Sequence, residues 1–273
     1  MLFDLGADSN TIGGTTVAAR NVISGNDSVG VDLGSFRNLI QGNFIGTDAS
    51  GTAALGSQQN GVNLGRSSNT IGGTTPGAVN VISGNGAGVV AFGSGNFILG
   101  NFIGTDVSGT RALGNSSCGV AASFGDSITI GGTTAGAGNV ISGNLRGVLV
   151  IQSTGTVIEG NFIGTDASGS SPLGNTENGV ELGSNSEQTI GPHNVIAFNG
   201  GQGVQVESGL GNRITANSIF SNGSLGVGLG GFGSPKRNDP GDADTGPNNL
   251  QNYPIINSVS VSGGNTTIAG THQ

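Results

Sequence analysis

Three aspartates that recur at nearly constant spacing are the first candidates for chemistry in this chain. Asp48, Asp106 and Asp166 each end the phrase Gly-Asn-Phe-Ile-Gly-Thr-Asp, 58 and 60 residues apart. If each repeat spans two stacked coils, adjacent carboxylates lie about 9.6 Å apart, at the edge of the separation used by inverting glycoside hydrolases. A catalytic pair needs two different environments, whereas a periodic row supplies equivalent ones. We therefore expect each aspartate to cap its own Asp-x-Ser-Gly turn, with calcium binding and catalysis as the alternatives.

A second pair of carboxylates lies near the start of the chain. Phe3-Asp4-Leu5-Gly6 matches Val31-Asp32-Leu33-Gly34, which predicts Asp4 and Asp32 at the outward position of one strand, one coil apart, with Asn63 on the next coil. Two carboxylates about 5 Å apart would bind a cation or share a proton. The alternative is two solvated side chains.

The segment near residue 240 gathers oxygen ligands in one loop. Asp239, Asp242, Asp244 and Asn248 offer the carboxylate and amide oxygens that Ca²⁺ takes. Their spacing is not that of an EF-hand, so the choice is between a calcium site and an ordinary acidic linker. The sequence predicts no other cofactor.

Basic and nucleophilic partners for these carboxylates are scarce. The arginines are predicted at corners or loops without a shared register, and the other candidates lie in a shortened loop or the tail: Arg20, Arg37, Arg66, Arg111, Arg146, His193, Lys236, Tyr253 and His272. The single cysteine, Cys118, has no evident His partner and is predicted to be a packing residue. With one Tyr and no Trp, the aromatic platform typical of sugar sites is missing.

Composition excludes several classes of partner. The net charge is −8 with only eight Lys and Arg in total, whereas nucleic-acid binding needs clustered cations. No apolar run approaches the roughly 18 residues of a membrane span. The 56 glycines suit a repeat with a glycine at every corner, since glycine adopts positive φ without steric cost.

The elements that position these residues are short strands separated by corners. One series of isoleucines recurs every 24 to 32 residues, a second series alternates with it, and a third segment of the type Gly-Val-x-Leu follows them. The first series is Ile12, Ile40, Ile71, Ile98, Ile130, Ile158, Ile190 and Ile214, and the second is Ile23, Ile45, Ile82, Ile103, Ile141, Ile163, Ile196 and Ile219. Three alternating segments per turn predict three strands and three corners. Stacked coils would bury the Ile, Val and Leu side chains together. The chain is therefore predicted to be an all-β solenoid of about eight three-strand coils.

One asparagine opens the second strand of each coil, and these residues are predicted to form a ladder; they are Asn21, Asn43, Asn80, Asn101, Asn139, Asn161, Asn194 and Asn217. Stacked Asn side chains would bond to each other and to the corner backbone. Two kinds of inserted loop alternate along the chain and should form two rows. Simple alternation puts Phe44, Phe102 and Phe162 outward, where we expect Leu55, Leu113 and Leu173 to cover them.

The Asn-x-Ile steps and Gly-Val-x-Leu segments resemble the right-handed parallel β-helix repeats of the pectate-lyase-like superfamily. The phrases Gly-Asn-Phe-Ile-Gly-Thr-Asp and Asn-Val-Ile-Ser-Gly-Asn resemble those of bacterial secreted or cell-surface members, over about residues 2–232. The resemblance implies a right-handed parallel β-helix. For function it implies less, because the superfamily includes lyases, hydrolases, epimerases and non-catalytic adhesive stalks. The Arg-x-Pro-x-x-Arg motif of pectate lyases and the Asn-Thr-Asp, Gly-His-Gly and Arg-Ile-Lys motifs of polygalacturonases are absent.

These observations give one interpretation and one alternative. Residues 1–232 are predicted to form the β-helix, and 233–273 an acidic Pro/Gly linker followed by the start of a strand pair, either a cap or a truncated next module. We expect a fragment of an extracellular or cell-surface protein, a non-catalytic structural or binding module that binds a polysaccharide, another cell-surface ligand or calcium. The alternative is a polysaccharide lyase or glycoside hydrolase. End-to-end self-association is expected of exposed strand edges.

Overall fold

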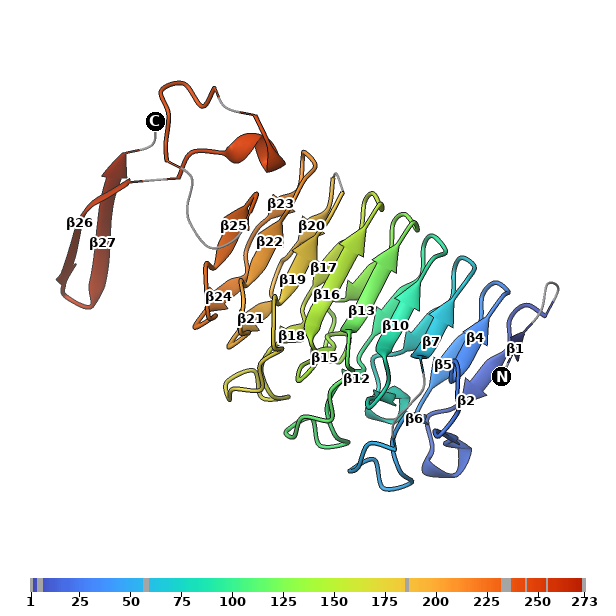
Figure 1. Ribbon diagram of the computed structural model, residues 1–273. Helices are drawn as coiled ribbons and strands as arrows, with labels where there is room; N and C mark the ends of the chain where they lie inside the picture. The colour runs from blue at the N-terminus through green and yellow to red at the C-terminus, as the bar shows by residue number, and fades with distance from the viewer. Residues whose placement is uncertain are drawn as a thin grey trace.

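A computed structural model describes residues 2–3, 7–55, 59–184, 187–231, 237–243, 245–253 and 255–271. It is an all-β stack of coils with three parallel sheets and one separate antiparallel hairpin (Figure 1). The fold class predicted from the repeats is therefore confirmed.

Each coil contributes one strand to each sheet, in chain order. Sheet A contains β1 (Leu2–Phe3), β4 (Val31–Leu33), β7 (Asn60–Leu64), β10 (Ala87–Ala91), β13 (Cys118–Ser123), β16 (Arg146–Ile151), β19 (Val180–Leu182), β22 (Val204–Val206) and β25 (Val227–Leu229). Sheet B contains β2 (Thr11–Gly13), β5 (Leu39–Gln41), β8 (Thr70–Gly72), β11 (Phe97–Leu99), β14 (Thr129–Gly131), β17 (Val157–Glu159), β20 (Thr189–Ile190) and β23 (Arg213–Ile214). Sheet C contains β3 (Val22–Ile23), β6 (Phe44–Ile45), β9 (Val81–Ile82), β12 (Phe102–Ile103), β15 (Val140–Ile141), β18 (Phe162–Ile163), β21 (Val195–Ala197) and β24 (Ser218–Phe220).

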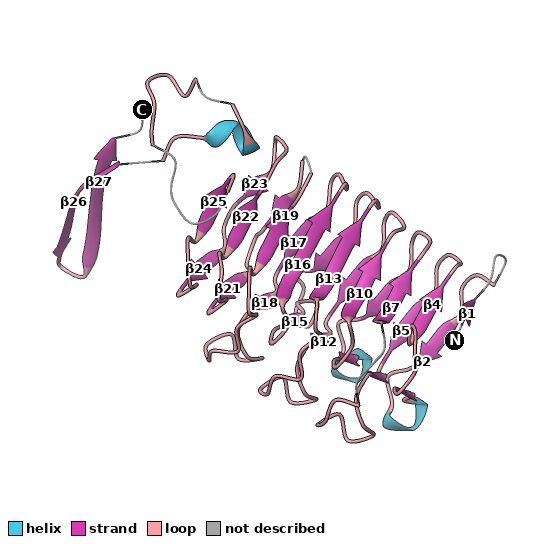
Figure 2. Ribbon diagram, in the orientation of Figure 1, coloured by secondary structure: helices cyan, strands magenta, loops and turns pink. Residues whose placement is uncertain are grey.

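The only helices in the described part of the chain are short 3-10 turns outside the sheets, η1 (Val17–Ala19), η2 (Pro76–Ala78) and η3 (Pro247–Leu250) (Figure 2). None of the described helices is long and apolar enough to cross a membrane. The antiparallel hairpin consists of β26 (Ile255–Ser262) and β27 (Asn265–Thr271).

The bore of the stack is the hydrophobic core, and its register is the one that the isoleucine series predicts. Ile40 pairs with Ile12 and Ile71 in sheet B, and Ile45 pairs with Ile23 and Ile82 in sheet C. Interior members such as Ile71 and Ile103 are fully buried. Alternation along each short strand thus places one apolar column per sheet inside the bore.

Asparagine ladders line all three corners, although the sequence predicted only one. The predicted ladder lies between sheets B and C; Asn101, for example, donates from its backbone N–H and from Nδ2 to Oδ1 of Asn139. A second ladder lies between sheets C and A and comprises Asn85, Asn115, Asn144, Asn175, Asn199 and Asn222. A third, between sheets A and B, begins with Asn10, Asn38, Asn69 and Asn96 and is interrupted by the buried Ile128.

The tail beyond sheet A starts by packing on the last coil. β25 ends at Leu229, close to the predicted boundary at residue 232, which itself lies outside the described residues. η3 lies beside the corner that follows β22, where Asn248 Oδ1 accepts from the backbone N–H of Asn212. Within the hairpin every described side chain of both strands is exposed.

Candidate functional site

The three recurrent aspartates lie in loops that follow sheet C and project from one side of the stack (Figure 1). Each loop is a small hairpin whose base is a bridge between the residue before the aspartate and the loop's other arm, as in Thr105 with Ala112. Although the loops belong to alternate coils, they contact one another, because the backbone N–H of Val107 donates to Gly51 O and that of Ala167 to Gly109 O. The repeats therefore build a continuous row of loops.

Each recurrent carboxylate is an acceptor for its own loop. Asp48 accepts from the Ser50 hydroxyl at 2.6 Å and from the backbone N–H groups of Thr52 and Ala53. Asp106 and Asp166 accept from the corresponding serine and backbone groups. The predicted turn cap is thus formed in all three loops.

The electrostatics of the three loops are alike. The Ser50 hydroxyl, followed by backbone donors, lowers the pKa of Asp48 below its ordinary 3.8. At Asp106 burial raises the pKa, but the donors outweigh it, and the pKa is again lowered. The Ser168 hydroxyl lowers the pKa of Asp166. None of the three is held in the protonated form that a general acid requires.

The phenylalanines of the same motif lie close to a glycine of their own loop. Phe44 is 2 % exposed and the guanidinium of Arg20 lies 4.0 Å from its ring centroid. A Cβ placed on Gly51 would come within 2.9 Å of that ring. Leu55 is 53 % exposed, and Leu113 and Leu173 are partly buried, so the cover of the phenylalanines by these leucines stays a prediction. Glycine is needed at Gly51 both for its positive φ and for this contact.

The predicted pairing of Asp4 with Asp32 involves only one described residue, Asp32. The residue of β1 that lies opposite Asp32 is Leu2, and its partner on the other side is Asn63. The sequence match aligned the two segments two residues away from the register that the sheet adopts. Asp4 itself lies outside the described residues.

The structure describes three of the four predicted calcium ligands, Asp239, Asp242 and Asn248. Asp239 accepts from the backbone of Ala243, and Asp242 from that of Asn252. Asn248 is directed instead to Asn212 of the β-helix. Asp244 lies outside the described residues. Among the described residues there is no group of three or more His, Cys, Asp and Glu side chains that could hold a metal ion.

The outer face of sheet A carries a polar cluster that sequence reasoning missed, which we call the sheet-A polar cluster: Arg146, Glu177, Asn178, Glu181 and Gln205. Arg146 Nη2 lies 2.7 Å from Glu177 Oε2, and Arg146 Nε lies 3.0 Å from Glu181 Oε2. Asn178 Nδ2 donates to Glu181 Oε2 at 3.0 Å and also to Gln205 Oε1. Arg146 was predicted at a corner, but it is the first residue of β16, opposite Cys118 of β13.

Next to this cluster the same face becomes apolar. Ala87, Val90, Cys118 and Ala121 form a buried group on the outer side of β10 and β13, and Leu149 of β16 packs against it. Burial raises the pKa of the Cys118 thiol, which agrees with a packing role. These strands are among the longest of the β-helix, with five residues in β10 and six in β13 and β16. The outer face of sheet A therefore offers a rigid surface with an apolar part and a charged part.

Only the register reveals this surface. Glu181 pairs with Leu149 on one side and with Gln205 on the other, and these residues share no motif in the sequence. An alignment of the Gly-Val-x-Leu segments would have identified the outward position of each strand in sheet A. It would not have predicted that the residues at this position change from apolar to charged from one coil to the next.

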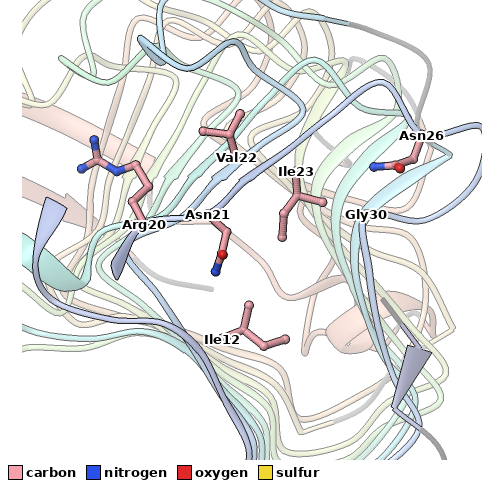
Figure 3. A pocket seen from close by; sticks show the side chains of 7 residues that line it. All are labelled: Ile12, Arg20, Asn21, Val22, Ile23, Asn26 and Gly30. Atoms are coloured by element: carbon pink, nitrogen blue, oxygen red, sulfur yellow. The ribbon is translucent and has the colours of Figure 1, made fainter. Parts of the chain in front are cut away.

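A pocket of about 390 Å³ lies at the N-terminal opening of the bore (Figure 3). Ile12 and Ile23 contribute its apolar walls and Arg20, Asn21 and Asn26 its polar ones. None of the described residues that line it carries a carboxylate, and Ile12, Ile23 and Asn21 are the first described members of two core columns and one ladder. Its shape therefore follows from the architecture of the coil.

No family model matches this chain, and a search of curated proteins finds no match.

Proposed function

We propose that this chain is a non-catalytic structural and binding module, a stiff rod of an extracellular or cell-surface protein. The observation that carries the proposal is the use of Asp48, Asp106 and Asp166 as acceptors within their own loops. The side chains that recur most regularly thus maintain shape. Membership of the pectate-lyase-like superfamily and a bacterial source belong to the same proposal and rest on the repeat phrases alone.

The ladders support the part of the proposal that concerns stiffness. Interior rungs such as Asn101 and Asn144 satisfy their amide groups with neighbouring rungs and with core backbone carbonyls. Since buried amides without partners are costly, bending that separates two coils would break several hydrogen bonds at once. Such a stack resists deformation along its axis.

The binding surface of the proposed module is the outer face of sheet A, and its ligand is a polysaccharide chain. Carboxylate, amide and guanidinium groups of the sheet-A polar cluster provide the acceptors and donors that sugar hydroxyls need. Leu149, which is partly buried and packs against Val90 and Ala121, provides apolar contact area for the C–H faces of the rings. Arg146, Leu149, Glu181 and Gln205 project from strands, and Glu177 and Asn178 lie in the corner before β19; strands hold side chains in fixed positions.

A binding experiment tests this proposal. Soluble acidic and neutral polysaccharides, with polygalacturonate and xylan as the first probes, are titrated against the chain by calorimetry. We expect weak, saturable binding that Arg146→Gln reduces about tenfold, because the substitution removes a charge held at the surface by two glutamates. Arg111→Gln, in the loop row, is the matched control and should leave binding unchanged. Equal loss in both variants, or no binding to any polysaccharide, would contradict the assignment.

A polysaccharide-active enzyme is the second candidate, and one observation favours it. Arg146 lies between Glu177 and Glu181 on the face where an extended substrate would lie. Most glycoside hydrolases use a pair of carboxyl groups as their catalytic residues. Release of new reducing ends or of unsaturated products from the same polysaccharides would support this candidate, provided that Glu181→Gln abolishes it. Binding without product would reject it.

A further inference from the structure

Two phenyl rings are exposed at the edge of sheet A, where its strands lead into the corner before sheet B. Phe92 follows β10 and Phe124 follows β13, and they are 44 % and 65 % exposed. The paired residues Ala91 and Ala122 are fully buried in the core. Since alternate residues of a strand point to opposite faces, Phe92 is directed outward, on the same face as the sheet-A polar cluster.

Phe124 occupies a position that is unfavourable for a phenylalanine. Its φ is +62°, a conformation that bulky residues rarely adopt, and most of its ring is in contact with solvent. Phe198 has a φ of +61°, but its ring packs edge-to-face on Phe220, with 5.6 Å between the ring centroids. Phe124 has no such ring partner in the described part of the chain. Exposed apolar side chains that lie together often mark a binding surface.

A line of polar side chains follows the corner beside the two rings, and we call it the corner polar line: Ser67, Ser94, Asp126 and Thr154. Ser67 Oγ accepts from the backbone N–H of Ser94, and Ser94 Oγ from that of Asp126, each at 3.1 Å. Asp126 Oδ1 accepts from the backbone N–H and the hydroxyl of Thr154, at 2.9 and 2.7 Å. The Thr154 hydroxyl and backbone N–H lower the pKa of Asp126, so the line includes an ionised carboxylate at neutral pH.

Glycines hold the rings and the corner polar line in a fixed relation. Each ring lies two residues before a member of the line, in Phe92-Gly93-Ser94 and in Phe124-Gly125-Asp126. A Cβ on Gly93 would lie 2.1 Å from the backbone carbonyl carbon of Arg66, and one on Gly125 would lie 2.6 Å from Gly93 O. The stacked backbones leave no room for side chains there, so neighbouring coils keep their spacing of about 4.8 Å at this corner.

Aromatic rings beside hydroxyl and carboxylate groups match the two kinds of surface that a sugar residue presents. The C–H faces of a sugar ring are apolar and pack on an aromatic face. Its hydroxyl groups lie around the edge of the ring and pair with hydroxyl and carboxylate oxygens. One Tyr and no Trp in the sequence predicted that no aromatic platform is present, but the two exposed phenylalanines provide one.

The edge with the two rings is continuous with the sheet-A polar cluster. β13 and β16 lie side by side (Figure 1), and β16 extends from Arg146 to Ile151, which lies opposite Ser123 of β13. The backbone N–H of Phe124 donates to Ile151 O at 3.1 Å. Five steps along a strand span about 16 Å. An extended oligosaccharide on this face therefore reaches from the rings, over Leu149, to Arg146.

The charges near this path favour a neutral ligand. Arg146 is matched by two glutamates, Asp126 adds a carboxylate at the corner, and Glu207 is exposed directly after β22. Carboxylates thus outnumber cations even when Arg66 at the corner is included, and the whole chain has a net charge of −8. Because like charges oppose association, a polyanionic polysaccharide is disfavoured.

We propose that Phe92 and Phe124 are stacking platforms of the polysaccharide site on sheet A, and that its ligand is a neutral polysaccharide bound in extended form from these rings to Arg146. The inference rests on the proposed function, because it names the ligand class and two further contact residues of the same site. Since the two ends of the site lie apart, affinity depends on ligand length: a disaccharide reaches one end, whereas a hexasaccharide reaches both.

The test is calorimetric titration of the full chain with xylohexaose and cellohexaose as neutral probes, hexagalacturonate as the acidic probe and xylobiose as the short probe. Phe92→Ala and Phe124→Ala are compared with Phe97→Ala. Phe97 is the matched control, because it is 43 % exposed and begins β11 of sheet B, opposite Thr70 and Thr129. In a chain without Trp, the fluorescence of Phe124→Trp reports contact at this position directly.

We expect a neutral hexasaccharide to bind about tenfold more tightly than hexagalacturonate and than xylobiose. Phe92→Ala and Phe124→Ala should each weaken its binding about fivefold without changing the melting temperature, because both side chains are exposed, and Phe97→Ala should have no effect. The emission of Phe124→Trp should shift to shorter wavelength when the hexasaccharide is added.

The outcomes separate this inference from the proposed function. If Arg146→Gln weakens binding and the Phe92 and Phe124 variants do not, the proposed function stands and the platforms are overturned. If hexagalacturonate binds as tightly as the neutral probes, the neutral ligand class is overturned. If no polysaccharide or oligosaccharide binds, the proposed function fails and the inference fails with it. Self-association of the wild-type chain that Phe124→Ala abolishes in sedimentation velocity would assign the rings to a contact between copies and overturn the platforms.

Discussion

The loop row beside sheet C and the outer face of sheet A differ in how their polar side chains are used. In the loop row the same three contacts recur around Asp48, Asp106 and Asp166, and the neighbouring loops bond to each other. On sheet A the outward position that holds Asn63 holds Ala121 two coils later and Glu181 after two more. Residues that every repeat needs for its shape recur, whereas residues at a binding surface need not. In this molecule the less regular surface is therefore the better candidate for function.

The ladders are the extreme case of recurrence, and breaking one should have the largest effect. Asn101→Ala removes the acceptor of Asn80 Nδ2 and the donors to Ile71 O and Asn139 Oδ1, all buried. Buried groups that lose their partners cost about 1–3 kcal/mol each, so the free energy of unfolding should fall by about 3 kcal/mol in urea titrations. Thr110→Ala on the exposed loop is the control and should change it by less than about 0.5 kcal/mol. Similar values for both variants would contradict a structural role for the ladder.

A second substitution tests the contacts within the loop row. A Cβ on Gly109 would lie 2.7 Å from Ala167 Cβ and 3.2 Å from Phe102, at a φ of +68°. We expect Gly109→Ala to lower stability by about 2 kcal/mol, from strain and from the forced separation of two loops. Gly95→Ala is the matched control, because its φ is +62° and nothing lies within 4 Å of the added atom. If both substitutions lower the melting temperature by the same amount, the loops are not held together by this contact.

The lowered pKa of Asp166 predicts a smaller, pH-dependent effect. The Ser168 hydroxyl, followed by backbone donors, favours the ionised carboxylate in the folded chain. Its contribution to stability is therefore present above the ordinary pKa of 3.8 and is lost as the pH falls through the lowered value. Asp166→Asn should lower the melting temperature slightly at pH 7, where the contribution is fully present, and should flatten its fall below about pH 4, where the two proteins converge. If the melting temperature of wild type and variant falls in parallel with pH, ionisation of Asp166 does not contribute to stability.

The smallest effect is expected from calcium. Asp239 and Asp242 already accept backbone hydrogen bonds in the tail, and Asn248 is engaged at Asn212. A ligand that binds only the folded state raises the melting temperature, so addition of calcium or of a chelator should leave it unchanged. A rise in the melting temperature with calcium that Asp242→Asn removes would contradict this expectation and identify the tail as a metal site.

The sequence was sufficient to predict the coil, because Ile71 and its counterparts recur with the spacing that three strands and three corners require. It also predicted the caps formed by the recurrent aspartates. It did not predict that Leu2 lies opposite Asp32, because a sequence match between two segments does not fix their register. The position of Arg146 was missed for a similar reason, since its relation to Glu181 depends on how far β16 extends toward the corner.

The central claim is that binding belongs to the outer face of sheet A and not to the recurrent carboxylates. The direct measurement is calorimetric titration of the best-bound polysaccharide against two variants, Arg146→Gln and the triple variant Asp48→Asn, Asp106→Asn and Asp166→Asn. The account predicts that the triple variant binds with unchanged affinity once its folding is verified, and that Arg146→Gln loses about tenfold. Loss of binding in the folded triple variant, with Arg146→Gln unaffected, would place function in the loop row and contradict the account.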